Sequence, residues 1–289
     1  CMRIRNAAVI ANIGVAHIEY LGSRAGILKA KMEIIEGMKE GSPLILNKDD
    51  DMLADLDCPQ MKKIYYGIEH SDCDVHAKDI QEEGGHTSFT IVYEGKEYPA
   101  VTPDLWTPQC TQCTGCICSR KRVLHAAGNS HQGVDRLQAS GMRQKVVQRN
   151  GICVVEDCYN AGPDSMKAAI RTFGSMKRPK DKPSRKILVM GDMLELGDYS
   201  KQAHYEAGQC AAQEDIDIIF CFGEQSIAAA QGAREACSGR GDKEILYFTD
   251  KEEMTKELLS LVEEGDILWF KASRGMKLEE VLSRLYERF

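Results

Sequence analysis

Short apolar runs alternate with longer amphipathic stretches throughout the second half of the chain, and this alternation restricts the fold more than any other feature of the sequence. Five runs rich in β-branched and aromatic residues follow Gly151 and are predicted to be strands: ICVVED, KILVMG, DIIFCFG, EILYF and ILWFKAS. Five intervening or following segments are predicted to be helices: Pro163–Met176, Tyr199–Gln213, Gln225–Cys237, Lys251–Glu263 and Met276–Arg288. Near-continuous apolar strands separated by helices indicate a parallel sheet covered on both faces. The sequence therefore predicts a doubly wound, Rossmann-like α/β domain.

Three polar loops follow strands of this predicted sheet. They read EDCYNAGPDS, GDMLELGDYS and KASRGM, and the first two are rich in carboxylates. In a doubly wound sheet, the loops at the carboxyl ends of the strands line the ligand-binding crevice. Two of these loops also have an ordinary structural explanation, since Asp157 can cap the helix that has Pro163 in its first turn, and KASRGM can be a solvated loop. The loops are therefore candidates for a site in combination rather than singly.

The first hundred residues follow a different pattern. AAVIANIGVAH is an apolar strand that ends in a polar loop, and SRAGILKAKMEIIEGM is a helix with Ser23 as its expected N-cap. SPLILN and KKIYYG are short strands, and residues 74–102 alternate apolar and polar positions with glycines between, as antiparallel hairpins do. The boundary between the two parts is expected near Met142–Asn150, which gives domains at 1–140 and 141–289.

Composition excludes several classes of protein. The chain has 289 residues, enough for roughly two domains, and a formal net charge of -7, which argues against a nucleic-acid partner. None of its apolar runs approaches the length needed for membrane insertion, and its first residues, CMRIRNAAVI, lack the charged start and long apolar core expected of a signal peptide. Several of its 12 cysteines, such as Cys153 and Cys221, lie inside apolar runs and are expected to act as small buried hydrophobic residues in a reducing cytoplasm.

Six segments, in this order along the chain, carry a resemblance to a known family: NIGVAHIEYLGS, LKAKMEI, SGMRQ, EDCYNAGPDSMKAAI, KILVMGDMLELG and FKASRGMKLEEV. The chain resembles the Mur ligases over nearly its whole length apart from about 104–136, and most closely the branch that adds D-alanyl-D-alanine to UDP-N-acetylmuramoyl-tripeptide. The resemblance implies the second half of a P-loop-type ATPase central domain followed by the Rossmann-like domain. It also implies ATP and Mg²⁺ as cofactors and an ADP-forming amide ligation through an acyl phosphate, in bacterial cytoplasmic synthesis of peptidoglycan precursors.

The resemblance assigns roles to residues of both parts. His17 matches a histidine that helps to hold magnesium, and Lys31 matches a lysine that relatives carry as a carbamate, an anionic magnesium ligand; Lys29 is close in sequence to Lys31. Arg143 matches an arginine that reaches the ATP phosphates, for which a guanidinium fork is suited. His17, Lys31 and Arg143 are thus the expected catalytic group.

The loops of the second part match ligand-binding positions of the family. Asp157 and Asn160 match the loop that closes on nucleotide and incoming amine, while Asp164 is expected beside the peptide substrate. KASRGM contributes the remaining substrate-binding candidates, which are Lys271, Ser273 and Arg274. Two departures from the family pattern occur: Ala11 stands where relatives have threonine, and Gly162 where they have asparagine.

The sequence contains no G-x-x-x-x-G-K-[ST] motif, the loop that cradles ATP phosphates. The family's catalytic glutamate and its UDP-binding domain also have no counterpart, and Cys1 begins inside an apparent strand. We therefore expect an N-terminally truncated enzyme that does not catalyse ligation alone, with the missing N-terminal half as its partner. Two alternatives remain: another Mur or folylpolyglutamate-type ligase, and a non-catalytic nucleotide- or metal-binding α/β module.

Four cysteines, Cys110, Cys113, Cys116 and Cys118, fall within nine residues. Their spacing comes close to an iron–sulfur run but differs at the last interval, and no second cysteine group supports a metal site. Read one base later, the codons of WTPQCTQCTGCICS permit G-H-H-N-V-H-N-A-L-A-A-Y-A, which matches the motif G-x-H-N-V-x-N-A-L-A-A that relatives carry there. We therefore favour the hypothesis that about 104–136 is a frame-shifted reading; a metal cluster and a divergent insertion are the alternatives.

Overall fold

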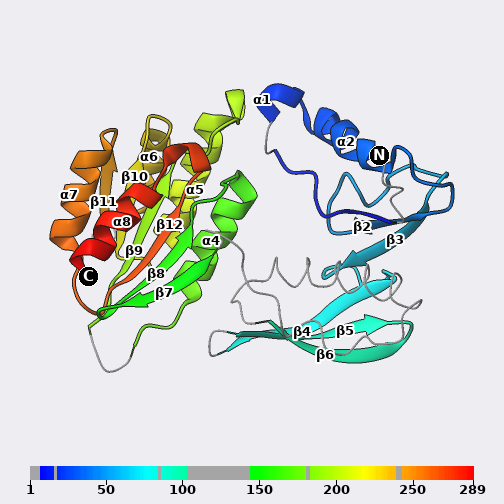
Figure 1. Cartoon of the computed structure of the whole chain (residues 1–289), viewed down its shortest axis with the longest axis horizontal. Coiled ribbons are helices and arrows are strands. Elements are labelled where there is room, and N and C mark those ends of the chain that lie inside the picture. Colours follow the sequence, from blue (N-terminus) through cyan, green and yellow to red (C-terminus); the bar gives the residue numbers. More distant parts are fainter. Residues whose placement is uncertain (1–6, 16–17, 84–85, 103–143, 180–182, 239–242) are drawn as a thin grey trace. The chain divides into compact units, whose positions relative to one another are not determined.

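The computed structural model describes residues 7–15, 18–83, 86–102, 144–179, 183–238 and 243–289 (Figure 1). The chain divides into two units, one comprising Cys1–Gly14 and Leu21–Leu137 and the other comprising Val15–Tyr20 and Gln138–Phe289. Each unit is built on its own sheet. The four clustered cysteines and the segment 104–136 lie outside the described residues.

The second unit contains a six-stranded sheet in the order β11-β10-β9-β12-β8-β7. Its strands are β7 (Lys145–Arg149), β8 (Ile152–Asp157), β9 (Lys186–Gly191), β10 (Ile218–Phe222), β11 (Glu244–Phe248) and β12 (Ile267–Lys271). All neighbouring pairs from β11 to β8 are parallel, and β7 pairs antiparallel with β8. The five predicted strands and the parallel arrangement are confirmed.

Strand β7 was not predicted, although the chain carries a signal for it. Asn150 and Gly151 link β7 to β8, and both have positive φ angles, of 40° and 88°. An Asn-Gly pair in this conformation forms a two-residue hairpin turn that matches the twist of the flanking strands. Because β7 is an edge strand with mostly exposed side chains, KVVQR lacks the continuous apolar run of its neighbours. The Asn150–Gly151 turn is therefore the sequence feature that indicates β7.

Helices cover both faces of this sheet (Figure 1). They are α4 (Pro163–Ser175), α5 (Ser200–Gln213), α6 (Ser226–Ala236), α7 (Lys251–Leu261) and α8 (Glu279–Arg288), with short 3-10 turns η2 (Gly197–Tyr199) and η3 (Arg274–Met276). One core joins α4, α5 and α6 to strand residues such as Val155 and Trp269, and the other joins α7 and α8 to Val154 and Leu268. Successive strand residues thus enter opposite cores, which explains why most positions of these strands are apolar.

The last helix begins later than expected. Helix α8 was predicted from Met276, but it starts at Glu279 because Lys277 adopts a left-handed conformation with φ of 51° and ends the η3 turn. The other predicted helices agree with the structure to within a few residues.

Two glycines allow α5 and α6 to touch backbone to backbone. A Cβ atom on Gly208 would lie 1.9 Å from the carbonyl oxygen of Ala229, and one on Gly232 would lie 2.2 Å from that of Tyr205. No side chain fits at either position without displacing a helix. This close packing fixes the position of α5 beneath the loops of the sheet.

The first unit contains a sheet in the order β1-β2-β3-β4-β5-β6. Its strands are β1 (Ala8–Ile10), β2 (Pro43–Asn47), β3 (Lys62–Gly67), β4 (Val75–Glu83), β5 (His86–Tyr93) and β6 (Lys96–Thr102). The pairs from β1 to β4 are parallel, and β4, β5 and β6 form the predicted antiparallel hairpins. β1 is much shorter than the apolar run AAVIANIGVAH suggested.

Helix α2 (Arg24–Met32) of the first unit begins as its sequence predicts. Ser23 is the N-cap, and its hydroxyl oxygen accepts the Gly26 N–H at 3.1 Å. The helix then tightens into η1 (Glu33–Ile35) instead of continuing through the whole apolar stretch. A short helix α1 (Ile18–Leu21) precedes it.

Within the described part of the chain, no helix has the length and apolarity needed to cross a membrane. Cys221 is fully buried and Cys153 is half-buried, so the expectation that these cysteines pack as small apolar residues is confirmed for Cys221 and only partly for Cys153.

Candidate functional site

A buried ion pair lies where β8 and β12 end. These strands are parallel neighbours whose register places Asp157 beside Lys271. Lys271 Nζ donates to Asp157 Oδ2 at 2.7 Å, and the two side chains are 3% and 8% exposed. The same ammonium lies 3.5 Å from the carbonyl oxygen of Asn160. Because a buried charge requires a partner, each of these residues holds the other in place.

Ser273 connects the three loops that the sequence singled out. Its hydroxyl oxygen accepts the Leu194 N–H at 2.9 Å and lies 3.4 Å from the Ala161 carbonyl oxygen, to which it donates. The Ser273 N–H in turn donates to the Asp192 carbonyl oxygen at 3.1 Å. One residue of the loop after β12 therefore joins the loops after β8 and β9, as expected for an edge at which parallel strands all end.

Asp192 is a further residue of this edge that sequence reasoning did not single out. Its carboxylate accepts the Ser226 N–H at 2.8 Å, the Ser226 hydroxyl at 2.6 Å and the Gln225 N–H at 3.2 Å. These amides begin α6, where N–H groups lack partners within the helix. Gly223 allows this close approach, since a Cβ there would lie 2.4 Å from the Asp192 carboxylate. The sequence feature that could have indicated Asp192 is its position directly after a predicted strand.

The solvent-facing part of the site is formed by Asn160, Asp164 and Arg274, which are exposed. The guanidinium carbon of Arg274 lies 5.5 Å from the centre of the Tyr159 ring, a cation–π contact that helps to hold the cation. Tyr159 is itself 39% exposed. The edge thus combines a buried, internally satisfied layer with an exposed cation.

The suggestion that Asp157 caps the next helix is wrong. Gly162 is the N-cap residue of α4, and the Ser165 hydroxyl accepts the Gly162 N–H at 3.0 Å. Pro163 occupies the first helical position, as its sequence predicts. Asp157 is instead committed to Lys271.

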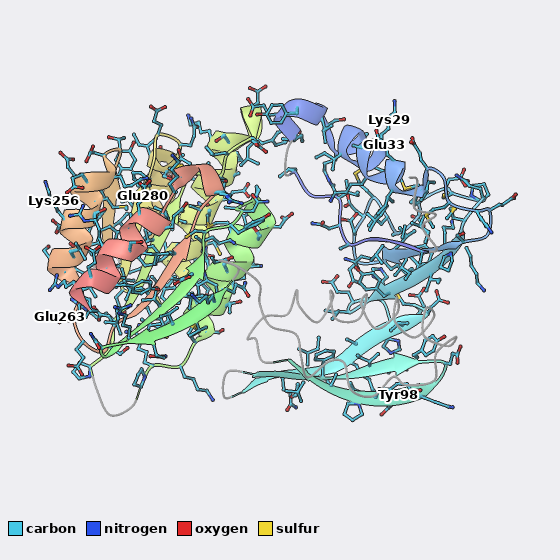
Figure 2. All side chains as sticks on the ribbon, viewed as in Figure 1. Lys29, Glu33, Tyr98, Lys256, Glu263 and Glu280 are labelled. Carbon is cyan, nitrogen blue, oxygen red and sulfur yellow. The ribbon has the colours of Figure 1, made fainter. Side chains whose placement is uncertain are left out.

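Lys31 lies in the first unit, on α2. Its ammonium donates to the Asn12 carbonyl oxygen at 2.6 Å and lies 3.4 Å from Asn12 Oδ1, so it binds the loop after β1. Desolvation by surrounding protein atoms lowers the pKa of Lys31, and the nearby Asp50 carboxylate opposes this shift. Lys29 lies on the outer side of α2 (Figure 2) and is exposed. His17 and Arg143 lie outside the described residues.

The loop after β1 is held from two other directions. Arg24 donates through Nε to the Ile13 carbonyl oxygen at 2.9 Å and forms an ion pair with Asp51. The Ile13 N–H donates to Asp50 Oδ2 at 2.6 Å. Both aspartates follow β2, so the loops after two neighbouring strands are joined here as well. Sequence reasoning passed over Arg24 because it looks like an ordinary helix residue.

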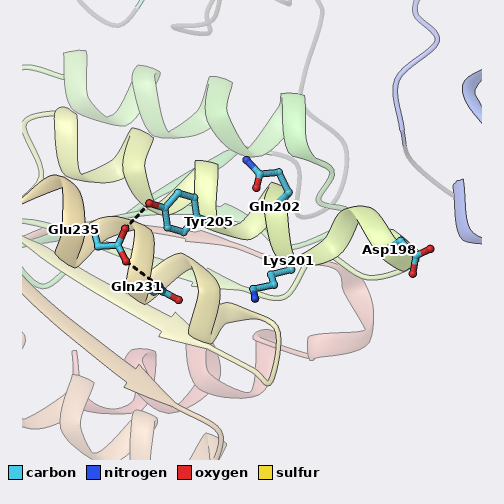
Figure 3. A pocket seen from close by; sticks show the side chains of 6 residues that line it. All are labelled: Asp198, Lys201, Gln202, Tyr205, Gln231 and Glu235. Carbon is cyan, nitrogen blue, oxygen red and sulfur yellow. Dashed lines mark hydrogen bonds between the residues drawn. The ribbon is translucent and has the colours of Figure 1, made fainter.

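An open pocket of about 540 Å³ lies elsewhere on the second unit, over α5 and α6 (Figure 3). It is lined by Asp198, Lys201, Gln202, Tyr205, Gln231 and Glu235. Glu235 accepts hydrogen bonds from the Tyr205 hydroxyl at 2.5 Å and from Gln231 Nε2 at 2.8 Å. None of the predicted site residues lines this pocket, which is a groove between two helices.

Two sequence profiles of one family match the chain in succession. The Mur ligase middle domain matches residues 4–104, and the glutamate ligase domain of Mur ligases matches residues 142–274. The chain belongs to the Mur ligase family. The stretch 105–141, which contains the clustered cysteines, lies between the two matches.

Individual Mur ligases match over almost the whole chain. It is 35% identical to the UDP-N-acetylmuramoyl-tripeptide–D-alanyl-D-alanine ligase of Bacillus subtilis, covering 98% of this chain and 59% of that protein. The Escherichia coli protein of the same name is 28% identical, with 97% and 60% covered. This chain therefore spans about three fifths of the length of the curated Mur ligases it matches.

Solved Mur ligases have the same fold. The MurF ligase of Thermotoga maritima in complex with ADP superposes with a TM-score of 0.79 at 25% identity, covering 99% of this chain and 62% of that one. A MurF structure from Acinetobacter baumannii gives a TM-score of 0.82 at 25% identity, with 98% and 60% covered.

Proposed function

We propose that this chain forms the middle and C-terminal parts of an ATP-dependent, ADP-forming ligase that adds D-alanyl-D-alanine to UDP-N-acetylmuramoyl-tripeptide in the cytoplasm. The observation that carries the proposal is the continuous match, in one order along both units, to relatives of that name. The convergence of the three loops on Ser273 supports it, because ligands of doubly wound sheets bind at the carboxyl ends of the strands.

The reaction joins an activated carboxyl group to an amine. The amine nitrogen attacks the carbonyl carbon of the acyl phosphate, a C–N bond forms, phosphate leaves with the electrons of the C–O bond, and the nitrogen loses a proton. The exposed guanidinium of Arg274 is suited to bind the carboxylate of the incoming dipeptide, since its fork matches two carboxylate oxygens. Asn160 and Asp164, exposed beside it, can orient the dipeptide's amine and amide groups.

Lys271 and Ser273 receive a different role from the one their resemblance implied. Both are buried, and their polar atoms are committed to Asp157, Asn160, Leu194 and Ala161. We assign them to positioning the loops, and leave direct contact with the dipeptide to Arg274, Asn160 and Asp164. Asp157 likewise helps to position the loop after β8, through its ion pair with Lys271.

The described residues fit Mg²⁺ only if Lys31 is modified. An ammonium group cannot bind a cation, and within the described ranges no cluster of three or more His, Cys, Asp and Glu residues could hold a metal. Desolvation lowers the pKa of Lys31 and so eases its deprotonation, and the neutral amine can add to CO₂ with loss of one proton to form a carbamate. We propose this carbamate and His17 as magnesium ligands; bound Mg²⁺ would neutralise charge on the phosphate groups.

We propose that ATP is bound jointly by this chain and by a phosphate-binding loop outside its 289 residues, because the sequence contains no such loop. Arg143 remains the candidate for the contact with the ATP phosphates. The missing part of the same enzyme is then the partner that completes the site.

Two chimeric proteins test this function. In both, the chain follows the N-terminal two fifths of the Bacillus subtilis relative; in the second, residues 104–136 also come from that relative. We expect the second chimera to form ADP and the ligated product that carries D-alanyl-D-alanine, both measured by mass spectrometry. The original chain alone should form neither. If the second of these chimeras binds ATP but accepts a single amino acid instead of the dipeptide, the result would favour another Mur ligase. If it binds ATP and ligates nothing, the result would favour a non-catalytic binding module.

The role of Arg274 is tested in the active chimera. Arg274→Ala should raise the KM for D-alanyl-D-alanine by about tenfold to a hundredfold, the loss expected for a charged hydrogen-bonding group. Arg284→Ala is the matched control, because Arg284 is 40% exposed on α8 and pairs with Glu252. Equal KM values for the two variants would contradict the assignment.

A further inference from the structure

His204 lies in the first half of α5, buried beneath the loop that follows β9. The residue is 2% exposed, and each ring nitrogen faces a backbone group. The Met193 N–H donates to Nε2 at 2.9 Å, and Nδ1 lies 2.7 Å from the Ser200 carbonyl oxygen. An amide N–H only donates and a carbonyl oxygen only accepts, so Nδ1 carries the proton and Nε2 carries none. The contacts therefore select the neutral imidazole in a single tautomer.

The loop between β9 and α5 connects this histidine to the candidate site. Met193 and Leu194 are consecutive, and their two N–H groups are held by different residues, His204 and Ser273. Glu195, the next residue, has a φ of 66°, a left-handed conformation that local backbone preferences do not favour. These two contacts hold the loop immediately before this left-handed residue.

We propose that neutral His204 is a positioning residue, which accepts the Met193 N–H and thereby fixes the loop after β9 and the orientation of the Ser273 hydroxyl between Leu194 and Ala161. Protonation would place an Nε2–H group against the Met193 N–H and remove the acceptor. The loop would then lose its anchor on the side of α5. The loop after β9 adjoins the proposed dipeptide site, so an effect of protonation on dipeptide binding rests on the proposed function. The anchoring of the loop by His204 does not.

Burial favours the neutral form of His204, and a nearby carboxylate acts against it. Burial lowers the pKa of His204 below its ordinary value, and the Asp192 carboxylate, 3.8 Å from Nε2, opposes the shift. Other charged groups on α4, η2 and α6, which pack against α5, are Asp164, Lys167, Arg171, Asp198, Arg234 and Glu235, and Glu195 lies in the loop itself. Lys167 pairs with Glu206, and Glu235 accepts from Tyr205.

Nuclear magnetic resonance of the whole chain with ¹⁵N-labelled histidine tests the tautomer without any substrate. His204→Gln identifies the His204 signals by their loss. We expect a protonated-type shift for Nδ1 and an unprotonated-type shift for Nε2, persisting to below about pH 6.5. The opposite tautomer, or titration at or above about pH 6.5, would overturn the proposal.

Amide hydrogen exchange then tests the anchoring. Protection of the Met193 and Leu194 amides should fall by about tenfold in His204→Leu, which removes the acceptor. His204→Gln retains an acceptor that does not titrate, so at about pH 7.5 the two amides should be protected nearly as well as in the wild type. Between about pH 7.5 and pH 5, protection of these amides should decline in the wild type and stay constant in His204→Gln. His70→Gln, a change of a half-exposed histidine in the first unit, is the matched control and should have no effect.

Undiminished protection in His204→Leu would overturn the anchoring role. If this variant does not fold, the different pH dependence of the wild type and His204→Gln remains decisive, and identical pH dependence would refute the proposal. Because neither measurement uses ATP or peptide, an inactive ligase leaves both results interpretable.

Discussion

Replacing Lys271 with methionine should destabilise the second unit by about 3–5 kcal/mol, because it leaves the Asp157 carboxylate buried without its partner. The two charges lie 2.7 Å apart, so an effective dielectric constant of about 20 gives a gross attraction of about 6 kcal/mol. Part of this attraction offsets the desolvation of both groups. Breaking the pair loses the attraction while the desolvation of Asp157 persists.

Urea unfolding measured by the fluorescence of Trp269 tests this expectation. Trp269 is 3% exposed, and its ring centre lies 5.8 Å from that of Phe173, so its emission reports the core of the second unit. Since the chain has two tryptophans, all variants carry Trp106→Phe. Lys256→Met is the matched control: Lys256 lies on α7 (Figure 2) with a 69% exposed side chain and a 3.9 Å contact to Glu252, and its loss should cost at most about 1 kcal/mol.

A double variant separates the ion pair from the loss of packing. Asp157→Asn combined with Lys271→Met removes both charges and should be more stable than Lys271→Met alone by about 1–3 kcal/mol. Equal losses of unfolding free energy in Lys271→Met and Lys256→Met would refute the reasoning. It would also be refuted if the loss in the double variant equalled the sum of the losses in Asp157→Asn and Lys271→Met.

Three further predictions concern other parts of the chain. Gly208→Ala should destabilise the second unit by at least about 2 kcal/mol in the same urea assay, because its Cβ would lie 1.9 Å from the Ala229 carbonyl oxygen, while Gln209→Ala should be nearly neutral. The pKa of His204 is lowered in the folded protein, so the unfolded chain binds the proton first as pH falls; stability should decline below about pH 6.5 by up to about 1.4 kcal/mol per pH unit, and His204→Gln should reduce that slope. Sequencing the DNA of codons 95–145 should reveal one gained and one lost base, and an unaltered reading would contradict the frame-shift hypothesis.

Much of the fold could be predicted because each element carries its own periodic signal. The strands β8, β9, β10 and β12 are buried on both faces and therefore read as mostly apolar runs, with charged residues only at their ends. Edge strand β7 has no such run, since its side chains mostly face solvent, and only the Asn150–Gly151 turn announces it. The start of α8 depended on a left-handed Lys277, which no residue preference predicts.

The sequence by itself determined the fold class of the second unit and placed Asp157, Asn160, Lys271, Ser273 and Arg274 at one edge, in strand ends and the loops that follow them, because parallel strands all end on the same side of their sheet. Which of these side chains face solvent was decided by the tertiary structure alone. The strand register puts Asp157 beside Lys271, and the packing of α5 brings His204 to Met193, across separations of 114 and 11 residues. Hydrogen bonds and burial of this kind depend on distances between elements, and sequence periodicity does not contain those distances.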